Sequence, residues 1–371
     1  MRIGLDGIVL RKPVAGSHRY FEELLTGLAQ PTAGNEFVVF SNLRSFRADA
    51  LPRQDNFSYR NVNTRRWVPA ALEQQLFPAW GAFGPLDVLH STVSVPPLWY
   101  HRPTVATVSD LAFELFPETT KWTGRWWRKI LTKPGIARAS RLITLSESTK
   151  RDLKNLFGVP SDKIRVVYPY TPPRFRPMPD VDAVAARYHL PSKYILYVGT
   201  LERRKNLTAL VRAFAEARRM ASLEHALVLV GQRGWLYEDV FRTVEELGLR
   251  DRVLFLGYVP DEDLPALYTH AELFVYLSLY EGFGLPPLEA MACGAPVIVS
   301  NVSSLPEVVG DAGLLVNPRD VPAIASEFVR VLADCDLRAA MRDRGLARAR
   351  LFSQERFIQQ TLEVYRDAAR V

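Results

Sequence analysis

The sequence is poor in cysteine, with only Cys293 and Cys335 among its 371 residues. Neither stands in a CxxC or Cys/His spacing, which excludes a disulfide framework and argues against a zinc site. We expect both to be buried thiols in a reducing compartment. No apolar run approaches the roughly 18 residues of a membrane span. The N-terminal MRIGLDGIVL has no signal-peptide features, so we expect a cytoplasmic protein.

Two common nucleotide-binding motifs are also absent. No strand-like run is followed by GxGxxG with a suitably placed acid, which excludes a dinucleotide-dependent dehydrogenase. No GxxxxGK[ST] is present, which excludes a P-loop kinase. Asp261-Glu262-Asp263 mimics a metal-binding DxD, but its context favours a helix cap and first turn. We therefore expect no obligatory metal and no other cofactor.

Positive charge is concentrated in one part of the chain. The net charge is +7, and Lys121–Arg176 alone holds 14 Lys and Arg against three acids, so the remaining residues sum to −4. A localised basic region marks a face that meets anions. The hydrophobic fraction of 48% and the length suit a globular protein of two domains.

Short apolar runs alternate with amphipathic stretches along almost the whole chain, a pattern typical of parallel doubly wound sheets. The expected strands of the first half are Arg2–Leu5, Phe37–Ser41, Asp87–His90, Thr104–Val108, Leu142–Leu145 and Val166–Tyr168. Those of the second half are Tyr194–Val198, Ala226–Val230, Val253–Leu256, Leu273–Tyr276, Val297–Val299 and Gly313–Val316. The pattern therefore predicts an α/β protein with two Rossmann-like domains.

A proline-rich linker separates the two halves. Pro169–Pro179 contains five prolines, which interrupt helices and ladders. We expect an N-terminal domain over 1–172 and a C-terminal domain over 178–353, with an amphipathic helix over 354–371 that packs back on the first domain. Two such domains facing across a cleft would bind ligands at the carboxyl ends of their strands.

The segment from Ser278 to Val297 carries the main chemical signal. A buried strand ends near Leu277, a turn with Gly282 and Gly284 follows, and a helix is expected to begin near Pro286 or Pro287. A strand, a glycine turn and a helix N-terminus together form a site for phosphate. Glu281 and Glu289 lie in otherwise apolar surroundings, where carboxylates need partners.

This segment resembles the E-x7-E signature of glycosyltransferase family 4, whose members have the GT-B fold and retain anomeric configuration. The resemblance covers nearly the whole chain. Tyr197–Leu207 is similar to the family's donor-diphosphate loop, Leu254–Tyr268 to its nucleobase-side segment, and Ser303–Pro318 fits as well.

The resemblance implies a role for each matching residue. Glu289 would bind the ribose hydroxyls, Glu281 would lie beside the donor sugar, and Arg204 and Lys205 would hold the diphosphate. Two adjacent cations can stabilise the charge that develops as a nucleoside diphosphate leaves. Phe283, Gly284 and Leu285 would offer backbone N–H groups to the phosphates. The remaining donor-side positions of this half are Thr200, Val259 and Gly282.

The first half supplies fewer candidates. Gly16 lies in the first βα turn, and two interpretations of it stay open. It would let a donor phosphate approach the backbone, or it is an ordinary turn glycine. Ser109 stands where the family has a histidine, so it can donate a hydrogen bond to the sugar or β-phosphate but cannot carry a positive charge. Asp110 follows it and is expected to orient the loop. His90 ends another strand, and a structural role is favoured over one in the cleft.

Three tryptophans and five cations alternate in Lys121–Lys133. As a helix, this segment would dock on an anionic membrane surface or capture a lipid-diphosphate acceptor. The alternative is a core helix with a solvated basic face. No nucleic-acid-binding motif accompanies it.

The expected activity is transfer of a hexose from a nucleotide diphosphate sugar to a saccharide or lipid-linked saccharide acceptor in cell-surface polysaccharide synthesis. Family analogy favours GDP-mannose or a related GDP-sugar as donor and leaves a UDP-sugar open. The rival interpretations are another GT-B enzyme, such as a sugar phosphorylase or an epimerase, and a GT-B-like scaffold without turnover.

Overall fold

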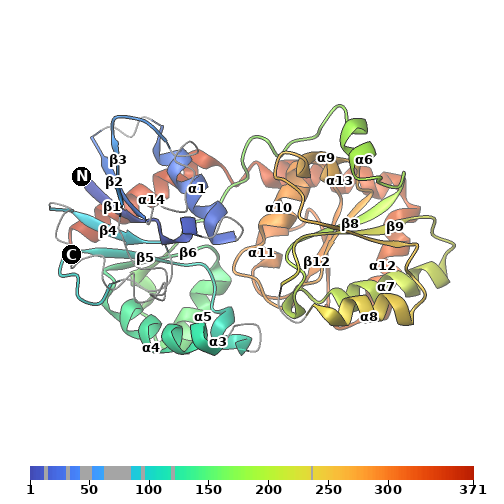
Figure 1. Cartoon of the computed structure of the whole chain (residues 1–371), viewed down its shortest axis with the longest axis horizontal. Helices are drawn as coiled ribbons and strands as arrows, with labels where there is room; N and C mark the ends of the chain where they lie inside the picture. The colour runs from blue at the N-terminus through green and yellow to red at the C-terminus, as the bar shows by residue number, and fades with distance from the viewer. Residues whose placement is uncertain are drawn as a thin grey trace. The chain divides into compact units, whose positions relative to one another are not determined.

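The computed structural model describes residues 1–11, 16–30, 34–41, 52–61, 85–92, 97–117, 122–234 and 237–371. The chain forms two compact units (Figure 1): Met1–Tyr170 with Gln354–Val371, and Thr171–Ser353. The domain bounds expected from the sequence, 1–172 and 178–353 with a returning helix over 354–371, lie close to this division.

The N-terminal unit is built on a parallel sheet of strand order β3-β2-β1-β4-β5-β6-β7. Its strands are β1 (Arg2–Asp6), β2 (Glu36–Ser41), β3 (Phe57–Asn61), β4 (Val88–Ser91), β5 (Thr104–Val108), β6 (Arg141–Thr144) and β7 (Ile164–Val166). The chain moves outward from β1 in one direction and from β4 in the other. The topological switch point therefore lies between these two strands.

The described helices of this unit cover both faces of its sheet. They are η1 (Ile8–Arg11), α1 (Gly16–Leu28), α3 (Ala112–Leu115), α4 (Trp122–Arg138), α5 (Glu147–Phe157), η6 (Ser161–Lys163) and α14 (Gln354–Ala369). In Figure 1, α1 and α14 lie on one side of the sheet and α3, α4 and α5 on the other. Helix α14 packs on α1 and on strands β4 to β6.

A buried polar network joins α14 to this sheet. His90 Nδ1 lies 2.7 Å from the hydroxyl of Tyr365 and its Nε2 lies 2.8 Å from Thr107 Oγ1. The hydroxyl of Tyr20 on α1 lies 3.1 Å from the same Thr107 oxygen. Burial lowers the pKa of His90 to about 3, so the imidazole is neutral near pH 7. The structural role favoured for His90 is confirmed.

The C-terminal unit is built on a second parallel sheet, of order β10-β9-β8-β11-β12-β13. Its strands are β8 (Tyr194–Val198), β9 (Ala226–Val230), β10 (Val253–Gly257), β11 (Leu273–Tyr276), β12 (Val297–Ser300) and β13 (Leu314–Val316). Here the switch point lies between β8 and β11. The inner strands are apolar and fully buried, as expected for a parallel sheet covered on both faces.

Helices cover both faces of this sheet as well. They are α6 (Asp182–Arg187), η7 (Arg203–Lys205), α7 (Leu207–Met220), α8 (Glu238–Glu246), α9 (Leu264–His270), α10 (Leu285–Ala292), α11 (Leu305–Val309), α12 (Val321–Ala333) and α13 (Cys335–Ala349). Helices α7, α8 and α12 lie on one side, and α9, α10 and α13 on the other (Figure 1). The predicted α/β class with two Rossmann-like domains is confirmed.

Three sequence-based expectations need correction. Strand β3 was not expected, because its sequence FSYRN has little apolar character. Strand β7 runs over Ile164–Val166 instead of Val166–Tyr168. Cys293 is buried, but Cys335 is exposed at the start of α13. Helix α10 begins at Leu285 with proline in its first turn, as expected.

Asp263 stands at the expected helix cap and has a further role. It precedes α9, but its carboxylate makes no capping hydrogen bond to the helix. It accepts hydrogen bonds from Arg187 Nη1 at 2.8 Å and from the Tyr188 hydroxyl at 2.7 Å. Asp263 therefore anchors α6 to α9. In the described residues, no group of His, Cys, Asp or Glu has a metal-binding arrangement, and no helix is long and apolar enough to cross a membrane.

Candidate active site

The strongest chemical cluster lies at the switch point of the C-terminal sheet. The segment after β8 leads into the 3-10 turn η7, and the segment after β11 leads to Glu281. A backbone hydrogen bond of 2.9 Å from the Leu279 N–H to the Arg204 carbonyl joins the two segments. Ligands of open α/β sheets bind at this position, outside the carboxyl ends of the strands on either side of the switch point.

Turn η7 presents Arg204 and Lys205 to Glu281. Lys205 Nζ donates to Glu281 Oε1 at 2.6 Å and to the Tyr276 hydroxyl at 2.8 Å. Arg204 Nη1 lies 3.3 Å from Glu281 Oε2 and donates to the Tyr280 carbonyl. The structure thus brings together the three residues that sequence analysis assigned to catalysis. Arg203, by contrast, is exposed.

Burial and charge act against each other in this cluster. Burial alone would raise the pKa of Glu281, but Lys205 and Arg204 overcome it and hold the pKa at about 2. Burial and the neighbouring Arg204 lower the pKa of Lys205, while Glu281 opposes that shift. Glu281 faces two cations, whereas Lys205 faces one close carboxylate. Neighbouring charges therefore offset the effect of burial on the pKa more strongly at Glu281 than at Lys205. Near pH 7 the carboxylate is ionised.

Two serines hold the turn that carries Glu281. Ser303 Oγ accepts a hydrogen bond from the Glu281 N–H at 3.0 Å. Ser304 Oγ lies 3.0 Å from the Glu281 carbonyl and 2.6 Å from that of Phe283. Ser303 adopts a left-handed φ of 54°, which costs a residue with a Cβ about 1 kcal/mol. No role for this pair was expected, because two adjacent serines before Leu305-Pro306 are a weak signal in the sequence.

Helix α10 follows this turn and begins at the site. Its N-cap is Gly284, with a φ of 117° that favours glycine. Pro286 and Pro287 occupy the first turn and have no N–H. Any amide donors at the helix start therefore precede Pro286, where Phe283, Gly284 and Leu285 lie.

Glu289, one turn into α10, is 1% exposed. The hydroxyl of Tyr268 on α9 donates to its Oε2 at 3.0 Å. This bond gives the buried carboxylate the polar partner that such a group requires. Glu289 and Glu281 both come from the segment after β11, and Glu281 belongs to the cation cluster whereas Glu289 faces α9.

The loops after β8 and β9 approach each other closely. A Cβ on Gly231 would overlap the carbonyl oxygen of Gly199, and Gly231 has a φ of 145°. A Cβ on Gly234 would press on the Thr200 side chain. Thr200 itself is exposed, whereas Val259, after β10, is 3% exposed. The contact between the two loops fixes the path by which the chain reaches Arg204.

The other predicted residues belong to the N-terminal unit. Gly16 is the exposed first residue of α1, and no described atom lies within 4 Å of the position its Cβ would take. Ser109 follows β5, and its carbonyl accepts from Thr149 Oγ1 at 3.4 Å. Asp110 Oδ1 accepts from the Ala112 N–H at 2.9 Å, which orders the loop before α3.

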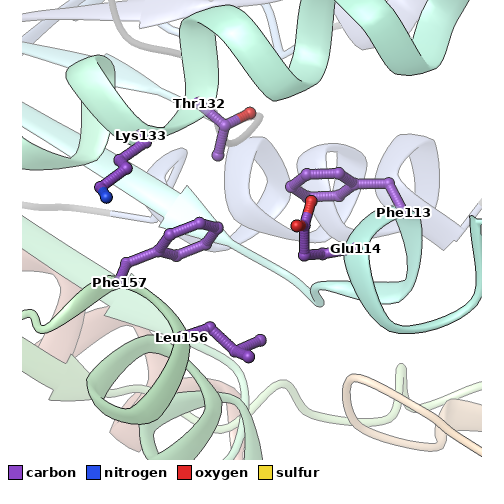
Figure 2. A pocket seen from close by; sticks show the side chains of 6 residues that line it. All are labelled: Phe113, Glu114, Thr132, Lys133, Leu156 and Phe157. Atoms are coloured by element: carbon purple, nitrogen blue, oxygen red, sulfur yellow. The ribbon is translucent and has the colours of Figure 1, made fainter.

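A separate cavity of about 240 Å³ lies among α3, α4 and α5. Figure 2 shows Thr132 and Lys133 of α4 facing Leu156 and Phe157 at the end of α5, with Phe113 and Glu114 of α3 on the third side. Most of the tryptophan-rich segment expected to face a membrane, Lys121–Lys133, lies outside the described side chains: α4 begins at Trp122, and its side chains are described from Ile130 onward.

Comparison with known proteins agrees with the fold. Residues 186–348 match the family Glycosyl transferases group 1, and residues 14–173 match Glycosyltransferase Family 4. O-antigen chain mannosyltransferase B of Escherichia coli is 36% identical over 374 residues, covering 96% of this chain and 97% of that protein.

Solved structures share the whole architecture. Sucrose-phosphate synthase from Thermosynechococcus elongatus superposes with a TM-score of 0.81 at 24% identity, covering 99% of this chain and 98% of that one. Anabaena Alr3699/HepE in complex with UDP and glucose gives a TM-score of 0.76 at 19% identity, covering 98% of each chain. The likeness establishes the two-domain GT-B fold. By sequence similarity, this chain is a glycosyltransferase and belongs to glycosyltransferase family 4.

Proposed function

We propose that the protein transfers a hexose from a nucleotide diphosphate sugar, GDP-mannose or a related GDP-sugar, to a saccharide or lipid-linked saccharide in cell-surface polysaccharide synthesis, with retention of configuration. The extended similarity to an O-antigen chain mannosyltransferase supports the mannosyl donor and the polysaccharide product. The observation that carries the proposal is the buried cluster of Arg204, Lys205 and Glu281 at the switch point.

The cluster suits the departure of a nucleoside diphosphate. In the proposed complex, the diphosphate lies against Arg204, Lys205 and the amides of residues 283–285. Two cations fixed in advance stabilise the charge that develops on the leaving oxygen without reorganising during the reaction. These cations take the role that a metal ion has in other transferases, so we propose that no metal is required. Full activity in the presence of EDTA is the expected result.

Glu281 is suited to positioning and not to proton transfer. Its pKa of about 2 keeps it ionised, so it is a poor proton donor near pH 7. Its two oxygens face Lys205 and Arg204, which weakens it as a nucleophile. We therefore propose front-face substitution, in which the acceptor hydroxyl attacks from the side the diphosphate leaves. A phosphate oxygen takes the proton, and Glu281 orients the sugar.

The assignments of Glu289, Thr200 and Val259 extend the donor site toward the nucleoside. Glu289 would accept hydrogen bonds from the ribose hydroxyls, with Tyr268 holding its carboxylate in place. Glu289→Gln is expected to weaken nucleoside diphosphate binding about tenfold, the loss typical of a hydrogen bond to a charged group. Unchanged binding would remove Glu289 from the donor site.

The N-terminal unit is proposed to hold the acceptor, and its Gly16, Ser109 and Asp110 are proposed to bind the donor. Helix α4 is proposed to contact an anionic membrane surface through 121–133, where lipid-linked acceptors reside. Its described part carries exposed Ile130 and Lys133. Binding to vesicles containing phosphatidylglycerol, weakened by salt and by Lys133→Glu, is expected. Absence of binding would leave the basic segment as a solvated helix face.

The donor is identified by thermal-shift screening of GDP, UDP and ADP and their sugars. A ligand that binds only the folded protein raises its apparent stability, by about 2.7 kcal/mol at a hundredfold excess over Kd. GDP and GDP-mannose are expected to give the largest shift. A larger shift with UDP would replace the proposed donor. A shift without transfer or donor hydrolysis would favour a scaffold protein.

A further inference from the structure

Glu202, a residue to which sequence analysis gave no role, is a direct partner of the cation cluster. It precedes turn η7, and its carbonyl accepts the Lys205 N–H at 3.0 Å. Its Oε1 lies 2.6 Å from Arg204 Nη2. The two side chains are 18% and 13% exposed, so water screens this ion pair less than a surface pair.

Arg204 is thus held at both ends of its guanidinium group. One end, Nη1, is directed to the Tyr280 carbonyl and Glu281, and the other end, Nη2, is directed to Glu202. Glu281 is bound to Lys205 as well, whereas Arg204 is the cation within ion-pair distance of Glu202 among the described residues. If Glu202 moves away from Arg204, only their own ion pair is broken. The pair between Glu281 and Lys205 stays intact.

The four charges of the cluster cancel. Glu202 and Glu281 balance Arg204 and Lys205 in a part-buried setting, where each charge acts over several ångströms. A diphosphate that enters this cluster meets two cations already occupied by carboxylates. Loss of the Glu202 charge would leave a net positive site and would favour any bound anion.

We propose that Glu202 is a resident counter-anion of Arg204. When the donor binds, Arg204 Nη2 moves from Glu202 to a phosphate oxygen. When the nucleoside diphosphate leaves, Nη2 pairs with Glu202 again. The inference rests on the proposed function, because it takes Arg204 to be a diphosphate ligand. Glu202 is a positioning residue: it keeps the guanidinium in place between turnovers and limits how tightly the product is held. No covalent step is assigned to it.

The test measures product affinity and release in Glu202→Gln, which keeps the shape of the side chain and removes its charge. The probe is whichever of GDP, UDP and ADP raises the melting temperature of the wild-type protein most. Calorimetry is expected to show Kd lowered roughly tenfold, the size of one charge acting at about 10 Å in an effective dielectric of about 20. Stopped-flow displacement is expected to show the change mainly in the rate of release.

Matched variants separate this role from a structural one. Glu202→Asp keeps the charge and is expected to stay within about twofold of the wild-type Kd, while Glu202→Ser, which removes the charge with a smaller side chain, is expected to behave like Glu202→Gln. Glu224→Gln removes one charge from the exposed pair with Lys193 in the same unit and is expected to leave Kd unchanged. A purely structural Glu202 would instead give weaker binding in Glu202→Gln and Glu202→Ser.

Failure of the inference and failure of the proposed function give different results. If the wild-type protein binds none of the three diphosphates, or if Lys205→Ala binds them as tightly as wild type, the proposed donor site is wrong and the role of Glu202 falls with it. If Lys205→Ala abolishes binding while Glu202→Gln and Glu202→Ser bind no more tightly than wild type, the donor site stands and the counter-anion role is overturned.

Discussion

The ammonium of Lys205 lies 2.6 Å from Oε1 of Glu281, and each side chain is 10% exposed. The attraction is strong because little water separates or surrounds the two groups. The same burial makes each charge costly if its partner is removed. The pair therefore links the stability of the C-terminal unit to the chemistry of its ligand site.

Glu281→Gln is expected to destabilise the protein by about 3 kcal/mol, because buried Lys205 loses its close carboxylate and Arg204 loses one of its carboxylate partners. Turnover is expected to fall at the same time. Urea unfolding followed by circular dichroism measures the first effect, and transfer assays the second. The exposed pair of Glu224 and Lys193 is the control, since Glu224→Gln should cost no more than about 0.5 kcal/mol. Full turnover in Glu281→Gln would remove Glu281 from the reaction.

Acid should weaken the protein through Glu281 in a defined window. Its pKa is lowered from 4.5 to about 2 in the folded protein. A carboxyl with a lowered folded pKa stabilises fully above its unfolded pKa and loses that contribution as the pH falls through the folded value. The unfolding free energy should therefore decline between about pH 4.5 and 2. Glu281→Gln should show a shallower decline over this range; an unaltered slope would contradict the assignment.

His90 should give a second pH dependence, at milder acidity. Burial lowers its pKa from 6.5 to about 3, so only the unfolded chain takes up a proton between these values. The unfolding free energy should fall by about 1.4 kcal/mol per pH unit below about pH 6. His90→Gln should lose this slope whatever its absolute stability, which unfolding curves at pH 7 and 5 would show. An unchanged slope would mean that His90 is protonated in the folded protein.

Two glycines offer a matched test of backbone approach. Gly231→Ala should cost more than about 2 kcal/mol, since its Cβ would overlap Gly199 and its φ is unsuited to other residues. Gly16→Ala meets no described atom and should change stability by less than about 0.5 kcal/mol. If a donor phosphate approaches α1, the same change should still reduce turnover. Full activity in Gly16→Ala would make Gly16 an ordinary turn residue.

The sheets and the center of the site could be predicted from the sequence for a physical reason. Strands such as Tyr194–Val198 are buried on both faces, so they read as unbroken apolar runs. Glu281 stood out because a carboxylate among apolar and glycine residues needs a partner. The resemblance assigned Arg204 and Lys205, directly after a strand, to the diphosphate; the structure pairs both with Glu281, a contact that was not predicted.

What could not be predicted depends on packing between distant segments. Strand β3 is marginally apolar and is defined by its pairing with β2. Ser303 and Ser304 act through hydrogen bonds to a turn about 20 residues earlier in the chain. Glu202 looks like any acid before a basic run, and only the direction of its side chain shows that it faces Arg204. The local sequence does not show which distant segment a strand or a side chain will contact.

The bond between His90 and Tyr365 joins residues 275 positions apart. The N-terminal unit is therefore discontinuous in the chain, whereas the C-terminal unit, Thr171–Ser353, is one unbroken stretch. During synthesis the second unit has all its residues before the first unit has its α14. Until α14 has been synthesised, the first sheet lacks one of its covering helices. Until α14 docks, the apolar surface beneath it is open to chaperones and to aggregation.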